Sequence, residues 1–253
     1  MDRLENLKNI IMYLMADEHV SHQIPSSLEE RQRMMRALMN VWEPRPIAEE
    51  DFLMKQDAEL QMQREDKGVV EVHDEGLTIW QGDITRLKAD AIVNAANAQA
   101  LGCWSPLHNC IDNCIHSAAG IQLRKECADK MQGRLLATGD AFITQGYNLP
   151  ARHVIHTVGP IIPDCIPSKE QEEQLAQCYR SCLDLAEQNG LGSIAFCCIS
   201  TGVFHFPNEL AARIAIETVK SYPRHSLKTI VFNVFLDKDR DIYEQFLGAY
   251  PMA

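Results

Sequence analysis

The stretch GDITRLKADAIVNAAN at residues 82–97 decides the fold of this chain. Its apolar run at residues 91–93 is flanked by turn-forming residues and predicts a short buried strand. Asn94 and Asn97 stand at the end of that strand, where open α/β sheets bind their ligands. Either asparagine by itself is more typical of a turn than of a ligand contact.

Strand and helix patterns alternate on either side of this stretch. Strands are predicted at residues 69–73, 77–80, 139–145, 153–158, 193–200 and 228–235. Helices are predicted at residues 111–130 and 170–189, from Asn208 onward, and at residues 239–250. Such alternation indicates a three-layer α/β domain. Cys178 and Cys182 lie one helical turn apart, and we interpret them as core packing because no third metal ligand lies near them in the sequence.

Residues 1–67 differ in amino-acid composition from the rest of the chain and contain no glycine. Three helices are predicted there: one with an apolar stripe, one over residues 28–40 behind a capping box, and one over residues 48–66. The stripe consists of Leu4, Leu7, Ile11 and Leu14, and the box of Ser27 and Glu30. We interpret the Met and Leu stripes as core rather than as a binding surface. The sequence thus predicts a helical N-terminal extension over residues 1–67, followed by a second domain over residues 68–253.

Composition and charge restrict the classes of function. The chain has 253 residues and a net charge of −11. Surfaces that bind nucleic acid through its phosphates are basic, so this charge argues against nucleic-acid binding. Backbone amides can still hold a small anionic ligand. No stretch is typical of a membrane span or a secretory signal peptide, and the nine cysteines are an odd number. We therefore expect a cytoplasmic protein with free thiols, and neither nucleic acid nor membrane as a partner.

The segment LGCWSPLHNCIDNCIHSAAG at residues 101–120 concentrates metal-binding side chains. Cys103, His108 and Cys110 are spaced C-x4-H-x-C in a segment whose glycine and proline predict an irregular loop. Two thiolates and one imidazole suit Zn²⁺, and three protein ligands are typical of a catalytic zinc with an open position. The alternative is that these residues are buried cysteines and a core histidine, because the strongest zinc signatures are longer and paired.

Two further features could belong to a site. Asp112 lies near the start of the helix predicted at residues 111–130, where the helix dipole also favours a simple first-turn acid. The strand at residues 193–200 runs into a turn that contains Gly202 and then into a helix. Strand, glycine turn and helix in this order aim backbone N–H groups at a phosphate, although a single glycine is weak support.

Five stretches closely resemble the macrodomain, an ADP-ribose-binding module, and cover roughly residues 77–250 in the right order. They are GDIT at 82–85, VNAAN at 93–97, IDNCIHSAAG at 111–120, GYNLPARHVIHTVGP at 146–160 and STGVFHFP at 200–207. The resemblance implies a three-layer α/β/α fold with a mixed central sheet. Within the family, the chain resembles the hydrolases that remove mono-ADP-ribose from proteins.

The loop before the aspartate-bearing helix departs from the usual macrodomain pattern. Most hydrolases of this branch have a run of glycines there, and this chain has GCWSPLHNC at residues 102–110. Together with the helical extension, this replacement resembles the microbial zinc-dependent macrodomains. It also removes the flexible glycines that other members use around the diphosphate.

The resemblance implies a role for each matched residue. Asp83 should accept a hydrogen bond from the adenine amino group, Ile84 should contact the same ring, and Phe235 should pack on it, with Phe232 as the alternative. Asn97 should hold hydroxyls of the distal ribose. Backbone N–H groups should wrap the diphosphate at Ser200, Thr201, Gly202, Val203 and Phe204. Zn²⁺ should be held by Cys103, His108 and Cys110.

The resemblance also implies hydrolysis at the anomeric carbon of the distal ribose, with Asp112 and Asn97 as catalytic residues. Asp112 would position or activate water, or stabilise positive charge on the ribose. The zinc would lower the pKa of a bound water or orient the ribose, and we favour orientation because two thiolates neutralise its charge. The modified side chain is expected to be acidic. The expected protein substrate is a lipoate-carrier protein modified by a sirtuin-like ADP-ribosyltransferase.

Three alternatives remain open at this point. The domain could be a reader that binds ADP-ribose without cleaving it. The zinc could be structural, in which case a fourth ligand such as Cys114 or His116 would close its shell. A nucleic-acid-binding or purely scaffolding protein has little support beyond the helical extension.

Overall fold

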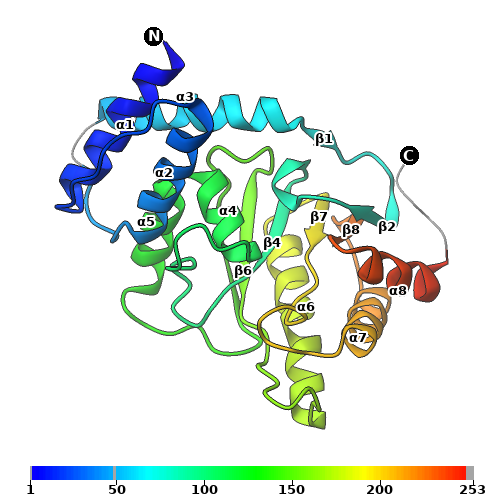
Figure 1. Ribbon diagram of the computed structural model, residues 1–253. Helices are drawn as coiled ribbons and strands as arrows, with labels where there is room; N and C mark the ends of the chain where they lie inside the picture. Colours follow the sequence, from blue (N-terminus) through cyan, green and yellow to red (C-terminus); the bar gives the residue numbers. More distant parts are fainter. Residues whose placement is uncertain (1, 48–49, 249–253) are drawn as a thin grey trace.

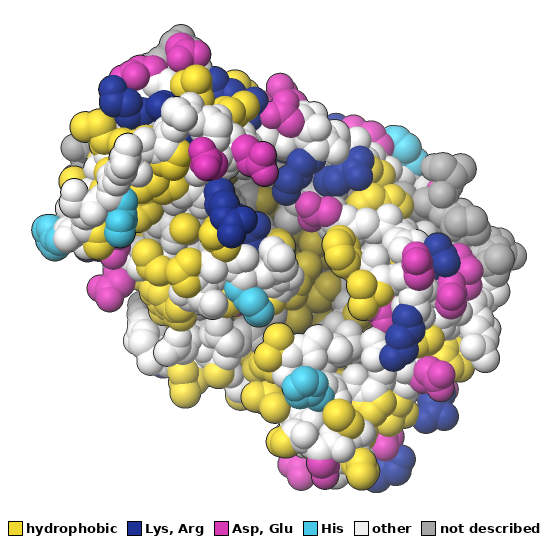
Figure 2. All heavy atoms as spheres, in the orientation of Figure 1, with side chains coloured by type: hydrophobic (Ala, Val, Ile, Leu, Met, Phe, Trp, Pro, Cys, Tyr) yellow, Lys and Arg dark blue, Asp and Glu magenta, His cyan; other side chains and the backbone are white. Residues whose placement is uncertain are grey.

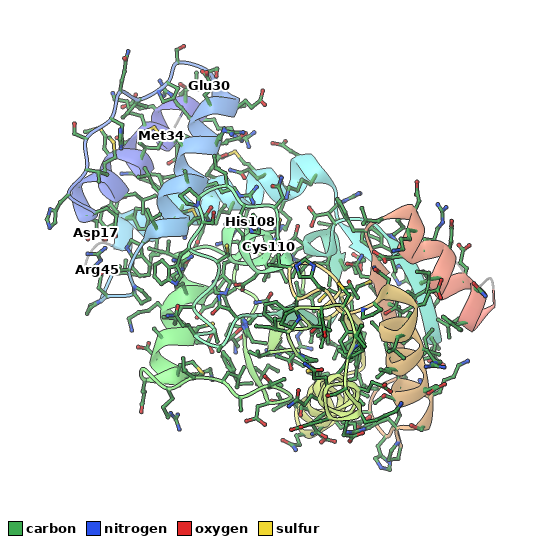
Figure 3. The ribbon with its side chains drawn as sticks, turned by 60° about the horizontal axis from the view of Figure 1, so that its bottom comes forward. Asp17, Glu30, Met34, Arg45, His108 and Cys110 are labelled. Atoms are coloured by element: carbon green, nitrogen blue, oxygen red, sulfur yellow. The ribbon has the colours of Figure 1, made fainter. Side chains whose placement is uncertain are left out.

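The computed structural model describes residues 2–47 and 50–248, which form an α/β unit with a cluster of helices packed on one side (Figure 1). That cluster is the extension, made of α1 (Arg3–Asp17), α2 (Leu28–Val41) and α3 (Glu50–Lys67). In Figure 3 its labelled residues Asp17 and Arg45 lie at the outer end, and their side chains form an ion pair of 3.2 Å. None of the described helices combines the length and the apolar character that a membrane span requires.

The extension has its own hydrophobic cluster, separate from the main core. The predicted stripes form it, because α1 buries Leu7, Ile11 and Leu14, and α2 buries residues such as Met35. The macrodomain-like part contributes Ile121, which packs into the same cluster. The interpretation of the Met and Leu stripes as core is confirmed. The division of the chain near residue 67 stays a prediction.

The predicted capping box of α2 is only half formed. The Ser27 side chain caps the helix by accepting a hydrogen bond from the backbone N–H of Glu30, at 3.3 Å. The Ser27 hydroxyl then donates to the Glu30 carboxylate, at 2.6 Å. The carboxylate therefore accepts from the hydroxyl in place of the Ser27 backbone N–H that a full box would use.

The main sheet is mixed, as predicted. Its strand order is β2 (Gly76–Gln81), β8 (Thr229–Val234), β7 (Ser193–Phe196), β4 (Ala91–Ala95), β6 (His153–Thr157) and β5 (Ala141–Gln145). Neighbouring strands are parallel except for β5, which pairs antiparallel with β6. Every residue of β8 is buried, as expected for a central strand covered on both faces.

Helices cover both faces of this sheet and complete the three layers (Figure 1). They are α4 (Ile111–Ala119), α5 (Ile121–Met131), α6 (Lys169–Gln188), α7 (Asn208–Ser221) and α8 (Asp237–Leu247). Helix α4 packs on β4 and α5 on β5. Helix α6 packs on β5 and β6, and α8 packs on β2 and β8. The extension reaches the fold through α2 and α3, which pack on α4.

Several predicted elements differ in extent. The helix predicted at residues 111–130 is two helices, because Gly120 adopts φ 102° and a side chain there would come within 2.8 Å of the Gln56 amide of α3. The strand predicted at residues 193–200 ends at Phe196. β1 (Val70–Glu71) pairs with β3 (Leu87–Lys88) and not with the neighbouring β2. The last predicted helix ends at Leu247, and residues 249–250 of that prediction lie outside the described residues.

Candidate active site

The predicted site residues gather at the carboxyl edge of the parallel strands. Asp83 follows β2, Phe235 follows β8, and Asn97 follows β4. The ends of β2 and β8 are tied together, since Gly82 N–H donates to the carbonyl of Val234 at 2.9 Å. The face seen in Figure 2 is hollowed near its centre, with hydrophobic side chains in the hollow. The carboxyl edge is where open α/β sheets bind ligands.

Cys103, His108 and Cys110 come together in the segment 101–110, here called the metal loop. Their ligand atoms all lie within 4.8 Å of one another, and Cys103 Sγ is 3.6 Å from His108 Nδ1. Figure 3 shows His108 and Cys110 side by side. The group contains no fourth ligand among the residues that the structure describes, and Cys114 and His116 lie outside it. A group of two thiols and one imidazole, with no fourth ligand among the described residues, fits a zinc ion with an open position.

The surroundings of Cys110 explain how a metal would change its charge. Cys110 caps α4, and its sulfur accepts a hydrogen bond from the N–H of Asn113 at 3.4 Å. Burial raises the pKa of the Cys110 thiol, and the nearby Cys103 and Asp112 raise it further. A divalent cation would reverse this balance, because a coordinating thiol loses its proton outright.

Asp112 begins α4 and is buried, with an exposed fraction of only 4%. Both of its oxygens are held: Asn94 Nδ2 donates to Oδ1 at 2.8 Å, and Asn97 Nδ2 to Oδ2 at 3.3 Å. Burial raises the pKa of Asp112 to about 6, although the hydrogen bond from Asn94 and the charge of Arg124 lower it. A buried carboxyl group with a raised pKa beside a candidate metal site is typical of a functional acid.

Asn97, which follows β4, connects the metal loop to Asp112 through hydrogen bonds. Its Nδ2 donates both to Asp112 and to the carbonyl of Gly102, the latter at 3.1 Å. Its Oδ1 accepts from the backbone N–H groups of Gln99 and Ala100, at 3.0 and 3.2 Å. A ribose hydroxyl that binds Asn97 would therefore replace or share one of these bonds.

A buried chain of hydrogen bonds beneath Asp112 did not emerge from the sequence. Asn94 Nδ2 donates to Asp112 and also lies 3.1 Å from His156 Nδ1, while His156 Nε2 lies 3.0 Å from the hydroxyl of Thr144. Burial lowers the pKa of His156 to about 3, so its ring is neutral. Because an amide N–H only donates, Nδ1 accepts and the ring proton is on Nε2. The spacing of these residues along the chain carries no signal that could have revealed them.

The tautomer of His156 decides whether a second group of side chains could bind a metal ion. His116, Cys127 and His156 are all buried, and their ligand atoms also lie within 4.8 Å of one another. The proton on His156 Nε2 points to Thr144, and that nitrogen is the one closest to the Cys127 sulfur, at 3.7 Å. A protonated nitrogen cannot ligate a metal. We therefore interpret this cluster as part of the core and not as a metal centre.

The segment 197–207 between β7 and α7, here called the phosphate loop, turns back through its own backbone. Phe206 N–H donates to the carbonyl of Ser200 and His205 N–H to that of Gly202, each at 3.0 Å. Ser200 adopts φ 65° and is buried, whereas Gly202 and Val203 are exposed. Thr201 and Phe204, the other two predicted members, are half-buried in the same loop.

The phosphate loop comes very close to Gly159, which follows β6. A Cβ atom at Gly159 would lie 1.9 Å from Ser200 Oγ and 2.8 Å from a methyl group of Ile199. Only glycine fits this approach, because no real Cβ atom makes such contacts. Gly159 thus determines how near the phosphate loop lies to the end of β6.

The residues predicted to bind adenine follow β2 and β8, the first two strands in the order of the sheet. Asp83 Oδ1 accepts from the N–H and hydroxyl of Thr85 at 3.0 and 2.6 Å, and Oδ2 is 3.2 Å from Lys67 Nζ at the end of α3. Burial opposes ionisation of Asp83, but the Thr85 bonds and the Lys67 charge keep its pKa below the usual value. Ile84 is buried beside it.

The two candidate aromatic residues differ in exposure. Phe235 has 70% of its surface exposed, which leaves its ring free to stack. Phe232 is buried in the core, with its ring centroid 5.2 Å from that of Tyr243. The structure therefore favours Phe235 over Phe232 as the stacking residue.

Comparisons with known proteins point to one family. A family model described as Macro domain matches residues 93–215. A protein-ADP-ribose hydrolase of Staphylococcus aureus (strain MSSA476) is 46% identical, over 97% of this chain and 97% of the relative. One of Treponema medium is also 46% identical, over 94% and 97%. A solved Oceanobacillus iheyensis macrodomain with ADPR is 39% identical, covers 70% of this chain and 94% of its own, and has a TM-score of 0.63.

Proposed function

This chain belongs to the macrodomain family and is a protein-ADP-ribose hydrolase like its relatives; we propose that it removes mono-ADP-ribose from modified proteins with the help of zinc. The observation that carries the proposal is the position of Asp112. Its buried carboxylate follows Cys110 by two residues and is held by Asn94 and Asn97 at the carboxyl edge of the sheet. A general acid or base needs such positioning close to the reacting bond.

The binding roles follow the layout of that edge. Asp83, Ile84 and Phe235 would hold the adenine, and exposed backbone of the phosphate loop would hold the diphosphate. Asn97 and Asp112 lie on the side of the metal loop, where the distal ribose would end. Binding through adenine and diphosphate is equal in the ground and transition states, so we assign it to affinity and not to rate.

The proposed reaction is hydrolysis at the anomeric carbon of the distal ribose. A water oxygen forms a bond to this carbon, and the bond from the carbon to the oxygen of an acidic protein side chain breaks. The electron pair of the broken bond leaves with that side chain as a carboxylate. The Asp112 carboxylate accepts the proton of the attacking water and stabilises the positive charge that develops on the ribose.

Cys103, His108 and Cys110 would hold the zinc ion. Zn²⁺ bound there would supply a Lewis acid, or a ligand position for ribose hydroxyls that orients the scissile bond. We favour orientation, since two thiolates neutralise the charge of the ion. The substrate that we propose is a lipoate-carrier protein modified by a sirtuin-like ADP-ribosyltransferase.

The test compares native protein with Asp112→Ala on a protein that carries mono-ADP-ribose. Catalytic amounts of the native protein should release free ADP-ribose, and Asp112→Ala should lose at least about a hundredfold in turnover, the typical range of general acid–base catalysis. The variant should keep about one zinc per chain and most of its affinity for ADP-ribose in calorimetry. Native protein that binds ADP-ribose but releases none would show that the domain is a reader.

A further inference from the structure

Helix α2 of the extension inserts a buried polar side chain beneath the metal loop. Asn40 has an exposed fraction of 1%, and its Oδ1 accepts a hydrogen bond from the backbone N–H of Leu107 at 3.0 Å. Its Nδ2 donates to the hydroxyl of Ser117 on α4, at 3.0 Å. A polar group buried this deeply is costly unless it is fully bonded. Asn40 therefore fixes the loop and α4 relative to α2.

Arg36, one turn earlier on α2, contacts the surroundings of two metal ligands. Its guanidinium donates to the backbone carbonyl of His108 at 2.9 Å and to Asn113 Oδ1 at 2.8 Å. Asn113 in turn donates its backbone N–H to Cys110 Sγ at 3.4 Å, and its side-chain amide to the carbonyl of Ser105 at 3.0 Å. Arg36 thus holds the backbone of His108 directly and reaches the Cys110 sulfur through Asn113.

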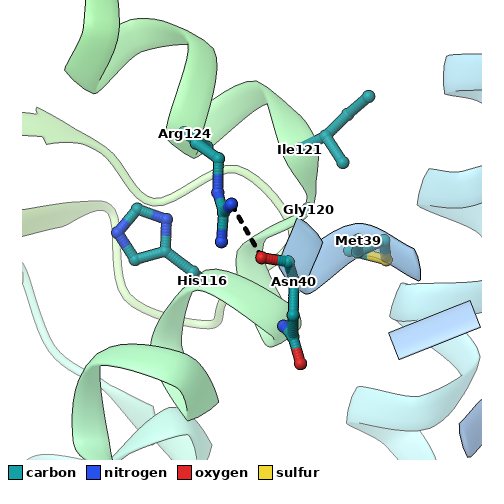
Figure 4. Close-up of a pocket in the computed structure, with 6 residues that line it drawn as sticks. All are labelled: Met39, Asn40, His116, Gly120, Ile121 and Arg124. Carbon is teal, nitrogen blue, oxygen red and sulfur yellow. Dashed lines mark hydrogen bonds between the residues drawn. The ribbon is translucent and has the colours of Figure 1, made fainter. Parts of the chain in front are cut away.

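The third ligand is tied to the carboxyl end of α2 through Arg124 (Figure 4). This buried guanidinium donates to the carbonyls of Asn40 and Trp42 at 2.8 and 3.2 Å, and to the carbonyl of Cys103 at 3.3 Å. It also lies 4.2 Å from the ring centre of Trp104. Burial lowers the pKa of Arg124 to about 10, so the group stays charged at neutral pH and complements the helix end.

The metal loop needs such support because its own backbone provides little. It contains no regular secondary structure, and Leu107 adopts φ 60°, a conformation that costs a branched residue energy. Each of the three proposed ligands is held, directly or through one neighbour, by a group bonded to α2. Outer partners of this kind set the orientation of metal ligands.

We propose that α2 is the positioning element of the metal loop and that Arg36 and Asn40 are positioning residues that set its zinc affinity. This inference rests on the zinc site of the proposed function. It gives the helical extension a role in the chemistry of the domain, where its hydrophobic cluster alone would indicate only a stabilising cap.

The experiment measures zinc affinity by competition with a chromophoric chelator, using the full chain. Arg36→Met and Asn40→Leu should each bind zinc roughly tenfold to a hundredfold more weakly than native protein, the usual effect of losing an outer partner. Arg36→Lys should lie between, because it keeps one charged donor. The matched control is Arg33→Met on the same helix, since Arg33 is exposed and makes no hydrogen bond or ion pair with another described residue.

A second readout does not depend on metal or on activity. In metal-free protein, hydrogen exchange at the Leu107 amide should be faster in Asn40→Leu, while amides of β4 and β6 keep native rates. Unchanged zinc affinity in both variants, together with unchanged Leu107 exchange in Asn40→Leu, would overturn the inference and leave the zinc site standing. Native protein that binds no zinc would overturn the inference and the zinc site together. If Asn40→Leu unfolds, the half-buried Arg36 still decides the question.

Discussion

The metal loop and the phosphate loop lie at the same edge of one sheet but are held in opposite ways. The phosphate loop bonds mainly to itself, with donors and acceptors three to six residues apart, and accepts one further backbone bond, from Ile162 N–H to the carbonyl of Phe204 at 2.8 Å. The metal loop is bonded by Asn40 and Arg36, which lie 67 and 72 positions away from the residues they contact. The phosphate loop is thus held mostly by local bonds and otherwise from within its own domain, whereas the metal loop depends on a separate group of helices.

This difference has a functional consequence. In the proposed function, a loop that is held within its own domain would still hold the diphosphate whatever happens to the extension. A loop that depends on remote side chains can lose its metal geometry while the rest of the domain stays folded. Ligand binding and metal binding should therefore respond to different substitutions, and three predictions test this separation.

The largest effect is expected from the metal ligands. Cys103→Ala and Cys110→Ala should each lose most of their zinc and their turnover, because the remaining two ligands do not suffice for a tight zinc site. The loss should appear in kcat more than in ADP-ribose affinity, since the proposed adenine and diphosphate contacts lie on other segments. Metal analysis, single-turnover kinetics and calorimetry measure the three quantities. Variants that keep full zinc would show that the ligand assignment is wrong.

A substitution at Gly159 should have a smaller effect, and it should lower ADP-ribose affinity instead of zinc binding. In Gly159→Ala the new methyl group meets Ser200 Oγ, which should shift the phosphate loop and cost about 3 kcal/mol of folding free energy, the upper range for overpacking. ADP-ribose affinity should fall while zinc content stays native.

Ser200→Gly offers a matched second change, because it removes that oxygen and suits the φ of 65°. The double variant Gly159→Ala with Ser200→Gly should recover part of both losses, as expected for neighbours that touch. If the losses of the two single variants simply added up in the double variant, the close approach of Gly159 to Ser200 would not control the position of the phosphate loop.

The comparison also explains what the sequence could predict. The strands, the carboxyl edge and the phosphate loop follow from local patterns, because apolar runs and turn residues act within a few positions. The positions of Asp112 and Phe235 were predicted from the family resemblance, and the structure places them at this edge. The break at Gly120 was missed, because the periodic pattern runs on through it. The need for glycine there comes from its φ of 102° and from the close side chains of Gln122 and Gln56.

The contacts of Arg36, Asn40 and His156 could not be predicted for the same reason. Each joins segments more than ten residues apart, and its partner is a backbone group or a neutral side chain that has no recognisable spacing. Lys67 beside Asp83 is a similar case, since it connects the end of the extension to the predicted adenine pocket. Remote side chains that hold loops are therefore the part of the site that only the structure provides.

The smallest effect concerns a third loop, remote from the site, that is also held by a remote side chain. The Glu187 carboxylate, near the end of α6, accepts from the backbone N–H groups of His225, Ser226 and Leu227 at 2.9, 2.8 and 3.2 Å. Burial opposes ionisation, but these bonds together lower the pKa of Glu187 from 4.5 to about 2. Between these two pH values the unfolded chain binds more protons than the folded one, so stability rises with pH.

The stabilisation by Glu187 is therefore complete above about pH 4.5 and is lost as the pH falls toward 2. Because solvent screens this partly exposed group, Glu187→Gln should cost only about 1 kcal/mol at pH 7. In urea unfolding, the difference from native protein should shrink steadily between pH 4.5 and 3, whereas Glu217→Gln, at an exposed position of α7, should change nothing. Zinc content and ADP-ribose affinity should stay native in both variants. If the difference in unfolding free energy between Glu187→Gln and native protein did not change with pH, the loop at residues 225–227 would need the shape of the Glu187 side chain and not its charge. This loop would then differ from the metal loop, for which we propose that the charged Arg36 is a positioning residue.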